Sequence, residues 1–93
     1  MPEIAVRVVI EGRVQGVGFR AWTAHEAARR NLRGWVRNRS DGSVEALFIG
    51  DADAVLSMLE ACRRGPRLAH VLAVNRTDAE DDGSRGFAER PTV

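Results

Sequence analysis

A strand followed by a glycine-rich loop is predicted by residues 3–20, which read EIAVRVVIEGRVQGVGFR. In residues 3–11 apolar side chains alternate with charged ones, which is the period of a strand with one buried face. Three glycines follow within residues 12–18, and glycine allows backbone N–H groups to turn inward and a ligand to approach closely. Alanine at helical spacing in residues 19–31 then predicts a helix.

A hairpin is predicted in the middle of the chain. Residues 32–38 form a short run of aromatic and β-branched side chains, and residues 44–50 form a second apolar run. Between them lies an Asp-Gly pair, the strongest short-range signal for a hairpin turn. We therefore expect two adjacent antiparallel strands.

A second helix is predicted between Asp51 and Gly65. Asp51 suits the N-cap position, and Gly65 followed by Pro66 is typical of a helix end. The apolar side chains at helical spacing are Val55, Met58, Leu59 and Cys62. Residues 67–75 read as a further strand and residues 78–86 as an acidic connector, and residues 87–90 could add a short fifth strand.

This β-α-β-β-α-β order predicts a ferredoxin-like α+β sandwich. Right-handed crossovers would place both helices on one face of a four-stranded antiparallel sheet. Residues 1–93 are long enough for one modest core, so we expect a single domain. Many unrelated functions use this fold, and it does not decide what the protein does.

Composition narrows the functional classes. The net charge is +1, too small for a general nucleic-acid binder, and all fourteen basic residues are arginine, which excludes chemistry that needs lysine. A single cysteine excludes an internal disulfide framework. No apolar run is long enough for a membrane span, and Glu3 and Arg7 interrupt the N-terminal apolar stretch, unlike a signal peptide. We expect a cytoplasmic monomer without nucleic-acid or membrane partners.

The loop before the first helix could bind an oxyanion. Free N–H groups and the positive end of the helix dipole attract anions, and the guanidinium of Arg20 can contact two oxygens of a phosphate or carboxylate. The glycine spacing G-x-x-x-G-x-G differs from the dinucleotide-binding pattern, and a nucleotide P-loop needs a lysine. On composition alone, an irregular turn in which the glycines serve only steric needs is an equal alternative. Asn38, at the end of a predicted strand, reads first as a turn residue, although its amide could hold a water molecule.

Two motifs resemble the acylphosphatase family. Residues 10–20, IEGRVQGVGFR, fit the pattern [LIV]-x-G-x-V-Q-G-[VH]-x-[FM]-R, and residues 34–50, GWVRNRSDGSVEALFIG, fit G-[FYW]-[AVC]-[KRQAM]-N-x3-G-x-V-x5-G. The similarity covers nearly the whole chain and is looser over residues 68–86. It implies hydrolysis of the carboxyl–phosphate bond of a small acyl phosphate by direct attack of water, without a metal or other cofactor.

The resemblance also implies roles for individual residues. Arg20 would bind the phosphoryl oxygens, and Asn38 would orient the attacking water. The backbone amides implied to complete the phosphate site are those of Gln15, Gly16, Val17, Gly18, Phe19 and Arg20.

Other candidate sites are weaker. Cys62 precedes RRGPR, but a cysteine-phosphatase loop would need arginine where Leu68 stands, so we expect a buried core cysteine. His25 and His70 lack the spacing of metal ligands, and the acids of residues 78–82 read as a solvated connector.

Two rival functions remain. An RNA-recognition module would need aromatic side chains on its central strands, where only Phe48 is available. A non-catalytic anion-binding domain, like the acylphosphatase-like segment of larger carbamoyl-transfer maturation proteins, would bind phosphate without turnover.

Overall fold

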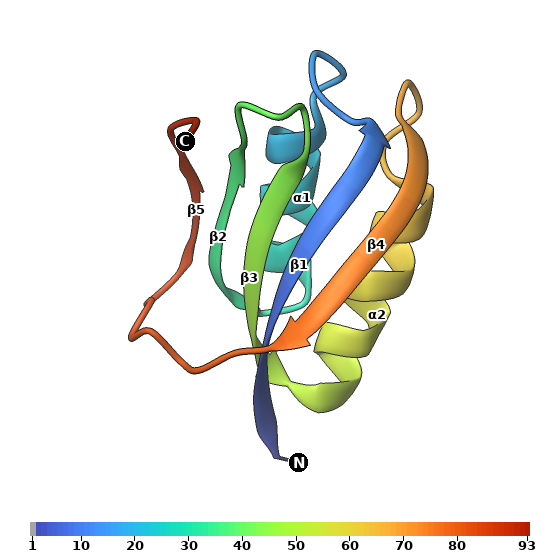
Figure 1. Ribbon diagram of the computed structural model, residues 1–93. Helices are drawn as coiled ribbons and strands as arrows, with labels where there is room; N and C mark the ends of the chain where they lie inside the picture. The colour runs from blue at the N-terminus through green and yellow to red at the C-terminus, as the bar shows by residue number, and fades with distance from the viewer. Residues whose placement is uncertain (1) are drawn as a thin grey trace.

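The computed structural model describes residues 2–93, which form two helices packed on one face of a five-stranded sheet (Figure 1). The elements, in chain order, are β1 (Glu3–Arg13), α1 (Phe19–Arg29), β2 (Arg33–Asn38), β3 (Val44–Asp51), α2 (Ala52–Arg64), β4 (His70–Asp78) and β5 (Phe87–Arg90). The strand order is β4-β1-β3-β2-β5. The ferredoxin-like α+β fold is therefore confirmed, and no helix among the described residues has the length and apolar character needed to cross a membrane.

The fifth strand makes the sheet mixed. The pairings β1–β3, β1–β4 and β2–β3 are antiparallel, as expected from the β-α-β-β-α-β order, whereas β5 pairs with β2 in parallel. The connector after β4 crosses from one edge of the sheet to the other at the end near the N-terminus (Figure 1). The connector thereby places β5 next to α1, and these two elements are in contact.

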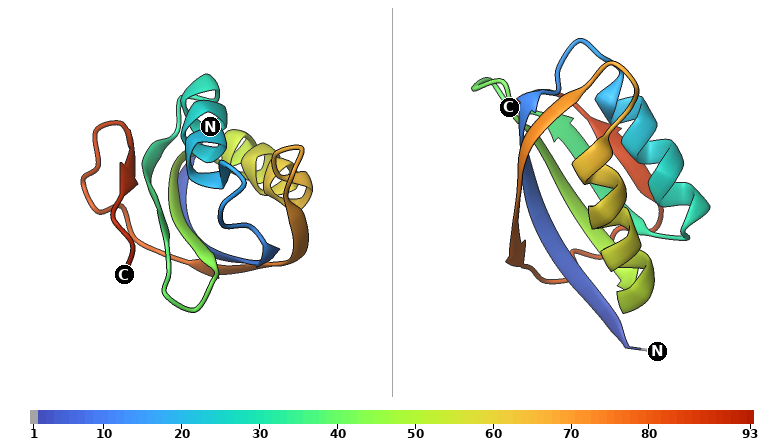
Figure 2. Two further views of the ribbon diagram at one scale, coloured as in Figure 1. Left: turned by 90° about the horizontal axis from the view of Figure 1, so that it is seen from above. Right: turned by 90° about the vertical axis from the view of Figure 1, so that its right-hand side faces the viewer.

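The main core lies between the sheet and the helices, which cover the same face in both views of Figure 2. The alternation in β1 sends Val6, Val8 and Ile10 into this core, where each is at most 1% exposed. From the helices, Phe19 begins α1 and Met58 lies on the apolar stripe of α2; both are buried. Burial of one such large apolar side chain stabilises the fold by roughly 1.5–3 kcal/mol.

The opposite face of the sheet holds a buried carboxylate. Glu45 of β3 is 3% exposed and accepts hydrogen bonds from Arg7 of β1 and from Arg37 of β2, the latter at 2.7 Å. Burial raises the pKa of the Glu45 carboxyl, but the hydrogen bonds and charges of Arg37 and Arg7 outweigh burial and leave the pKa below its ordinary value. Phe48 is fully buried in the core under the helices, so it offers no surface for base stacking.

Helix α2 begins and ends where the sequence predicts, whereas α1 ends earlier than expected. Asp51 occupies the N-cap position of α2, but its side chain makes no capping hydrogen bond, and its buried Oδ1 has no partner among the described residues. Helix α1 ends at Arg29 rather than near residue 31, because Asn31 adopts a left-handed conformation with φ of 58°. The α2 stripe of Val55, Met58, Leu59 and Cys62 is buried as predicted.

Candidate active site

Three segments meet at the end of the sheet where β1 and β2 finish. They are the loop between β1 and α1 with the first turn of α1, the end of β2, and β5, and they enclose a hollow of about 200 Å³. Its lining residues are Val14, Gln15, Gly16, Gly18, Phe19, Arg20, Ala21, Asn38 and Glu89. The structure thus brings Arg20 and Asn38 into one hollow. Val17, also expected to take part, does not line the hollow; it is half-buried and packs against the core.

The loop is shaped by two glycines in the left-handed region. Gly16 has φ of 73° and Gly18 has φ of 77°, and no atom would lie within 4 Å of a Cβ at either position. Backbone conformation rather than space therefore requires glycine here. Gly12, which we placed with these residues, belongs instead to β1. It lies at an irregularity in the pairing with β4, where a Cβ would collide with the carbonyl of His70.

The backbone N–H groups of this loop are uncommitted. Gly18 is the N-cap of α1, and the first amide that closes the helix is that of Trp22, which donates to the Gly18 carbonyl at 3.0 Å. Within the described chain, none of the N–H groups of residues 15–20 donates a hydrogen bond to another group. Consecutive free amides at a helix N-terminus form a ready-made site for an anion.

Arg20 stands in the first turn of α1 beside these amides. Its Nη1 lies 3.5 Å from the carbonyl oxygen of Arg90, which is a weak contact at the limit for a hydrogen bond. Among residues 2–93 it forms no salt bridge. Because most of its guanidinium donors have no protein acceptor, they are available to the oxygens of a bound anion.

Asn38 is the last residue of β2, and its backbone is held from two sides. It pairs with Val44 of β3, and its carbonyl accepts a hydrogen bond from the amide of Val93 at 3.2 Å. The amide of Ser40 in turn donates to the Val93 carbonyl at 2.7 Å. The side-chain amide of Asn38 has no hydrogen-bond partner within the described residues, so it is free to bind a water or a substrate oxygen.

Sequence reasoning missed the part that the Gln15 side chain plays. Its Nε2 donates hydrogen bonds of 2.8 Å to the carbonyls of Arg39 and Ser43, which lie in the turn between β2 and β3. This side chain therefore connects the glycine loop to the turn that follows Asn38. The local sequence gave no sign of these partners, because they lie far along the chain from Gln15.

The other candidate residues lie elsewhere. Cys62 is buried in the core, and burial raises its pKa to about 12, so it is not a reactive thiolate. His25 on α1 and His70 on β4 are both exposed. Within residues 2–93 no three His, Cys, Asp or Glu side chains are grouped as metal ligands.

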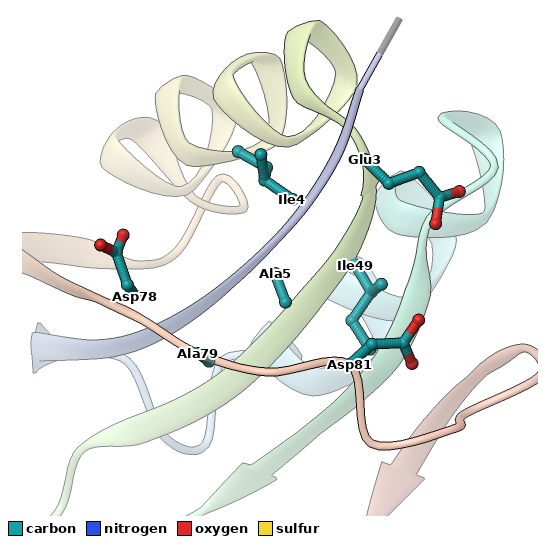
Figure 3. Close-up of a pocket in the computed structure, with 7 residues that line it drawn as sticks. All are labelled: Glu3, Ile4, Ala5, Ile49, Asp78, Ala79 and Asp81. Carbon is teal, nitrogen blue, oxygen red and sulfur yellow. The ribbon is translucent and has the colours of Figure 1, made fainter.

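A larger hollow of about 510 Å³ lies at the other end of the sheet, where β1 begins (Figure 3). Ala5 and Ile49 lie within it, Glu3 and Asp81 stand on one side, and Asp78 stands apart from them in Figure 3. Arg33 bonds both Glu3 and Asp81, at 2.9 and 2.8 Å. The hydrogen bonds from Arg33 and from the Gly83 amide lower the pKa of the Asp81 carboxyl. With no free cationic group in its lining, this hollow lacks the features of an oxyanion site.

Comparison with known proteins shows the family to which this chain is similar. The family model of acylphosphatase matches residues 6–89. An acylphosphatase from Acidiphilium cryptum strain JF-5 is 54% identical over 89 residues, which cover 96% of this chain and 98% of that protein. The crystal structure of acylphosphatase from Bacillus subtilis has a TM-score of 0.91 at 39% identity and covers 94% of this chain and 98% of that chain.

A structure of full-length HypF in the phosphate- and nucleotide-bound form is also similar, with a TM-score of 0.90 at 25% identity. The match covers 98% of this chain but 12% of the HypF chain. The match therefore covers nearly the whole length of the two acylphosphatases but only a small part of the much longer HypF chain. The chain belongs to the acylphosphatase family, whose known activity is the hydrolysis of acyl phosphates.

Proposed function

We propose that Arg20 and the backbone amides of residues 15–20 bind the phosphoryl group of an acyl phosphate while Asn38 orients the attacking water. The phosphoryl oxygens would take the free N–H donors of the loop, and the guanidinium of Arg20 would contact two of them. Water held by the Asn38 amide would attack phosphorus directly. The carboxylate would leave with the electron pair of the broken P–O bond, and inorganic phosphate would be the second product.

The chemistry of an acyl phosphate suits these few groups. A carboxylate is a good leaving group, so no general acid is needed to expel it. The transition state of phosphoryl transfer carries its charge on the equatorial oxygens, and catalysis rests on positioning and on charge stabilisation. Preorganised amides and one arginine supply both. A phosphomonoester would expel an alkoxide and would need more help than the hollow offers.

Two observations carry this proposal. Within residues 2–93 none of the N–H groups of residues 15–20 donates a hydrogen bond, and the neighbouring guanidinium of Arg20 forms no salt bridge there. Burying or crowding such donors without acceptors is unfavourable unless water or a ligand satisfies them. A purely structural turn would instead close some of these donors onto its own carbonyls. Asn38, to which the proposal assigns the attacking water, also lines this hollow.

The test is hydrolysis of benzoyl phosphate, measured with and without a chelator, beside p-nitrophenyl phosphate. We expect chelator-insensitive release of phosphate from benzoyl phosphate and little release from p-nitrophenyl phosphate. Inorganic phosphate should inhibit competitively, because it fits the same donors. Binding of phosphate without turnover would instead assign a non-catalytic anion-binding role. Loss of activity with the chelator would contradict direct, metal-independent attack.

We also propose that the protein acts as a monomer in the cytoplasm. Size-exclusion chromatography with light scattering tests the first part, and a mass close to 10.2 kDa is expected. Cell fractionation tests the second.

A further inference from the structure

We propose that Glu89 selects acyl phosphates whose acyl part carries no further negative charge. The inference rests on the proposed binding of the phosphoryl group by residues 15–20. It concerns the other portion of the substrate, about which the motifs are silent, and it rests on a residue of β5 that neither motif contains.

The sheet register directs Glu89 toward the helix side. In the parallel pairing of β5 with β2, Glu89 lies opposite Val36, whose side chain is fully buried under the helices. Side chains that face each other across two strands share a side of the sheet. Phe87, two residues earlier, also lies on this side and stacks on Phe48 with ring centroids 5.7 Å apart. Glu89 accordingly lines the same hollow as Arg20 and Asn38.

Contacts on both sides of Glu89 hold its backbone in place. The carbonyl of Arg90 lies 3.5 Å from Nη1 of Arg20, and Val93 exchanges hydrogen bonds with the end of β2 and the residues after it. The pairing of β5 with β2 extends from Phe87 to Arg90. The carboxyl group is therefore presented by an anchored strand rather than by a loose chain end.

The charge of Glu89 is not neutralised by a salt bridge within the part of the chain that the structure describes. Glu89 is exposed, and within residues 2–93 no arginine or histidine forms a salt bridge with it. It is also the only carboxylate among the residues lining this hollow. The lining of the hollow therefore holds one cationic group, Arg20 on α1, and one anionic group, Glu89 on β5.

We expect the two parts of the substrate to lie near different charges in the hollow. The phosphoryl group belongs beside the loop amides and Arg20, since these are the donors. The acyl part must then extend toward the remaining walls, one of which is β5. A second negative charge there would be repelled by Glu89. For unit charges separated by roughly 6 Å in a partly solvated site, the expected discrimination is about three- to tenfold.

The experiment uses three substrates of similar shape and different charge: benzoyl phosphate, 4-carboxybenzoyl phosphate and 4-(aminomethyl)benzoyl phosphate. The kcat/KM of each is measured for the wild-type protein, for Glu89→Gln and for Glu80→Gln. Glu80 is an exposed carboxylate of the connector outside the hollow, so its variant is a control for the same change in net charge. Circular dichroism and thermal unfolding establish that each variant is folded.

We expect the wild-type protein to prefer benzoyl phosphate over its carboxylated analogue, and we expect Glu89→Gln to reduce this preference by about threefold or more. The same variant should lose relative activity on the aminomethyl analogue. Both ratios should stay at wild-type values in Glu80→Gln, and in the wild type both should weaken at high ionic strength. A merely structural effect of Glu89 would change kcat/KM by the same factor for all three substrates.

Two failures are distinguishable. If the wild-type protein hydrolyses benzoyl phosphate but the ratios are the same in Glu89→Gln, the selective role of Glu89 is wrong while the proposed function stands. If the wild-type protein hydrolyses none of the three substrates, the proposed function itself is wrong, and the inference about Glu89 falls with it.

Discussion

The side-chain nitrogen of Gln15 lies 2.8 Å from the carbonyl oxygen of Arg39, the residue that follows Asn38. A second bond of the same length reaches the carbonyl of Ser43. The glycine loop and the strand end that presents Asn38 are therefore connected by one side chain. Because the proposed phosphate-binding groups and Asn38 come from these two segments, we expect their relative position to depend on Gln15.

Replacing Gln15 tests this connection. Gln15→Ala removes two hydrogen bonds and leaves two carbonyls to water, so we expect a loss of about 1–2 kcal/mol in the free energy of unfolding. We also expect kcat toward benzoyl phosphate to fall, because the loop and Asn38 are no longer held in register. Denaturant unfolding and steady-state kinetics measure the two effects. A destabilised variant with an unchanged kcat would show that Gln15 is structural only.

Removing the guanidinium tests phosphate binding. Arg20→Ala should abolish measurable turnover and weaken inhibition by inorganic phosphate, since the amides alone cannot supply a full charge. Arg20→Lys should recover little, because an ammonium group does not match two oxygens at once. The control is Arg67→Ala, which removes an exposed arginine outside the hollow. Unchanged phosphate inhibition in Arg20→Ala would remove Arg20 from the site.

Asn38 should affect the rate more than binding. Asn38→Ala is expected to lower kcat on the order of 100-fold or more, because one group that orients water or stabilises developing charge is lost. Inhibition by phosphate should be largely retained, since the loop donors are untouched. The measurement is the kcat and the phosphate inhibition constant of the folded variant. A wild-type kcat would return Asn38 to the role of a turn residue.

Glu45 should stabilise the fold in a pH-dependent way. The carboxyl has a lower pKa in the folded protein than its ordinary value of 4.5, so the folded state binds fewer protons than the unfolded state. Its contribution is complete above this ordinary value and is lost as the pH falls through the lower folded value. At neutral pH we expect Glu45→Gln to cost about 1–3 kcal/mol in the free energy of unfolding.

Denaturant unfolding of the wild type and of Glu45→Gln across this acidic range measures the effect. The difference between them should shrink below about pH 4.5, the ordinary pKa of a glutamate. Glu60→Gln, at an exposed position of α2, is the control and should show little difference at any pH. A difference for Glu45→Gln that is constant with pH would contradict the ionised hydrogen-bonded pair.

Local patterns in the sequence were sufficient for most of the fold. The period of two in β1, the stripe from Val55 to Cys62 and the Asp-Gly turn each reflect interactions between residues near one another in the chain. These patterns placed the helices on one face, and they located Arg20 and Asn38 at a helix start and a strand end. The need for glycine at positions 16 and 18 is also a local property of the chain. A left-handed backbone conformation favours glycine wherever it occurs.

Long-range pairing decided the rest. The parallel pairing of β5 with β2 depends on the path of the connector, and only this pairing brings Glu89 into the same hollow as Arg20. Gln15 finds its partners in the turn between β2 and β3 for the same reason. Periodicity determines which residues can be buried or turned, because that is a local property of the chain. Contacts between distant segments decide which elements enclose the hollow and which charged side chains line it. No local pattern specifies these contacts.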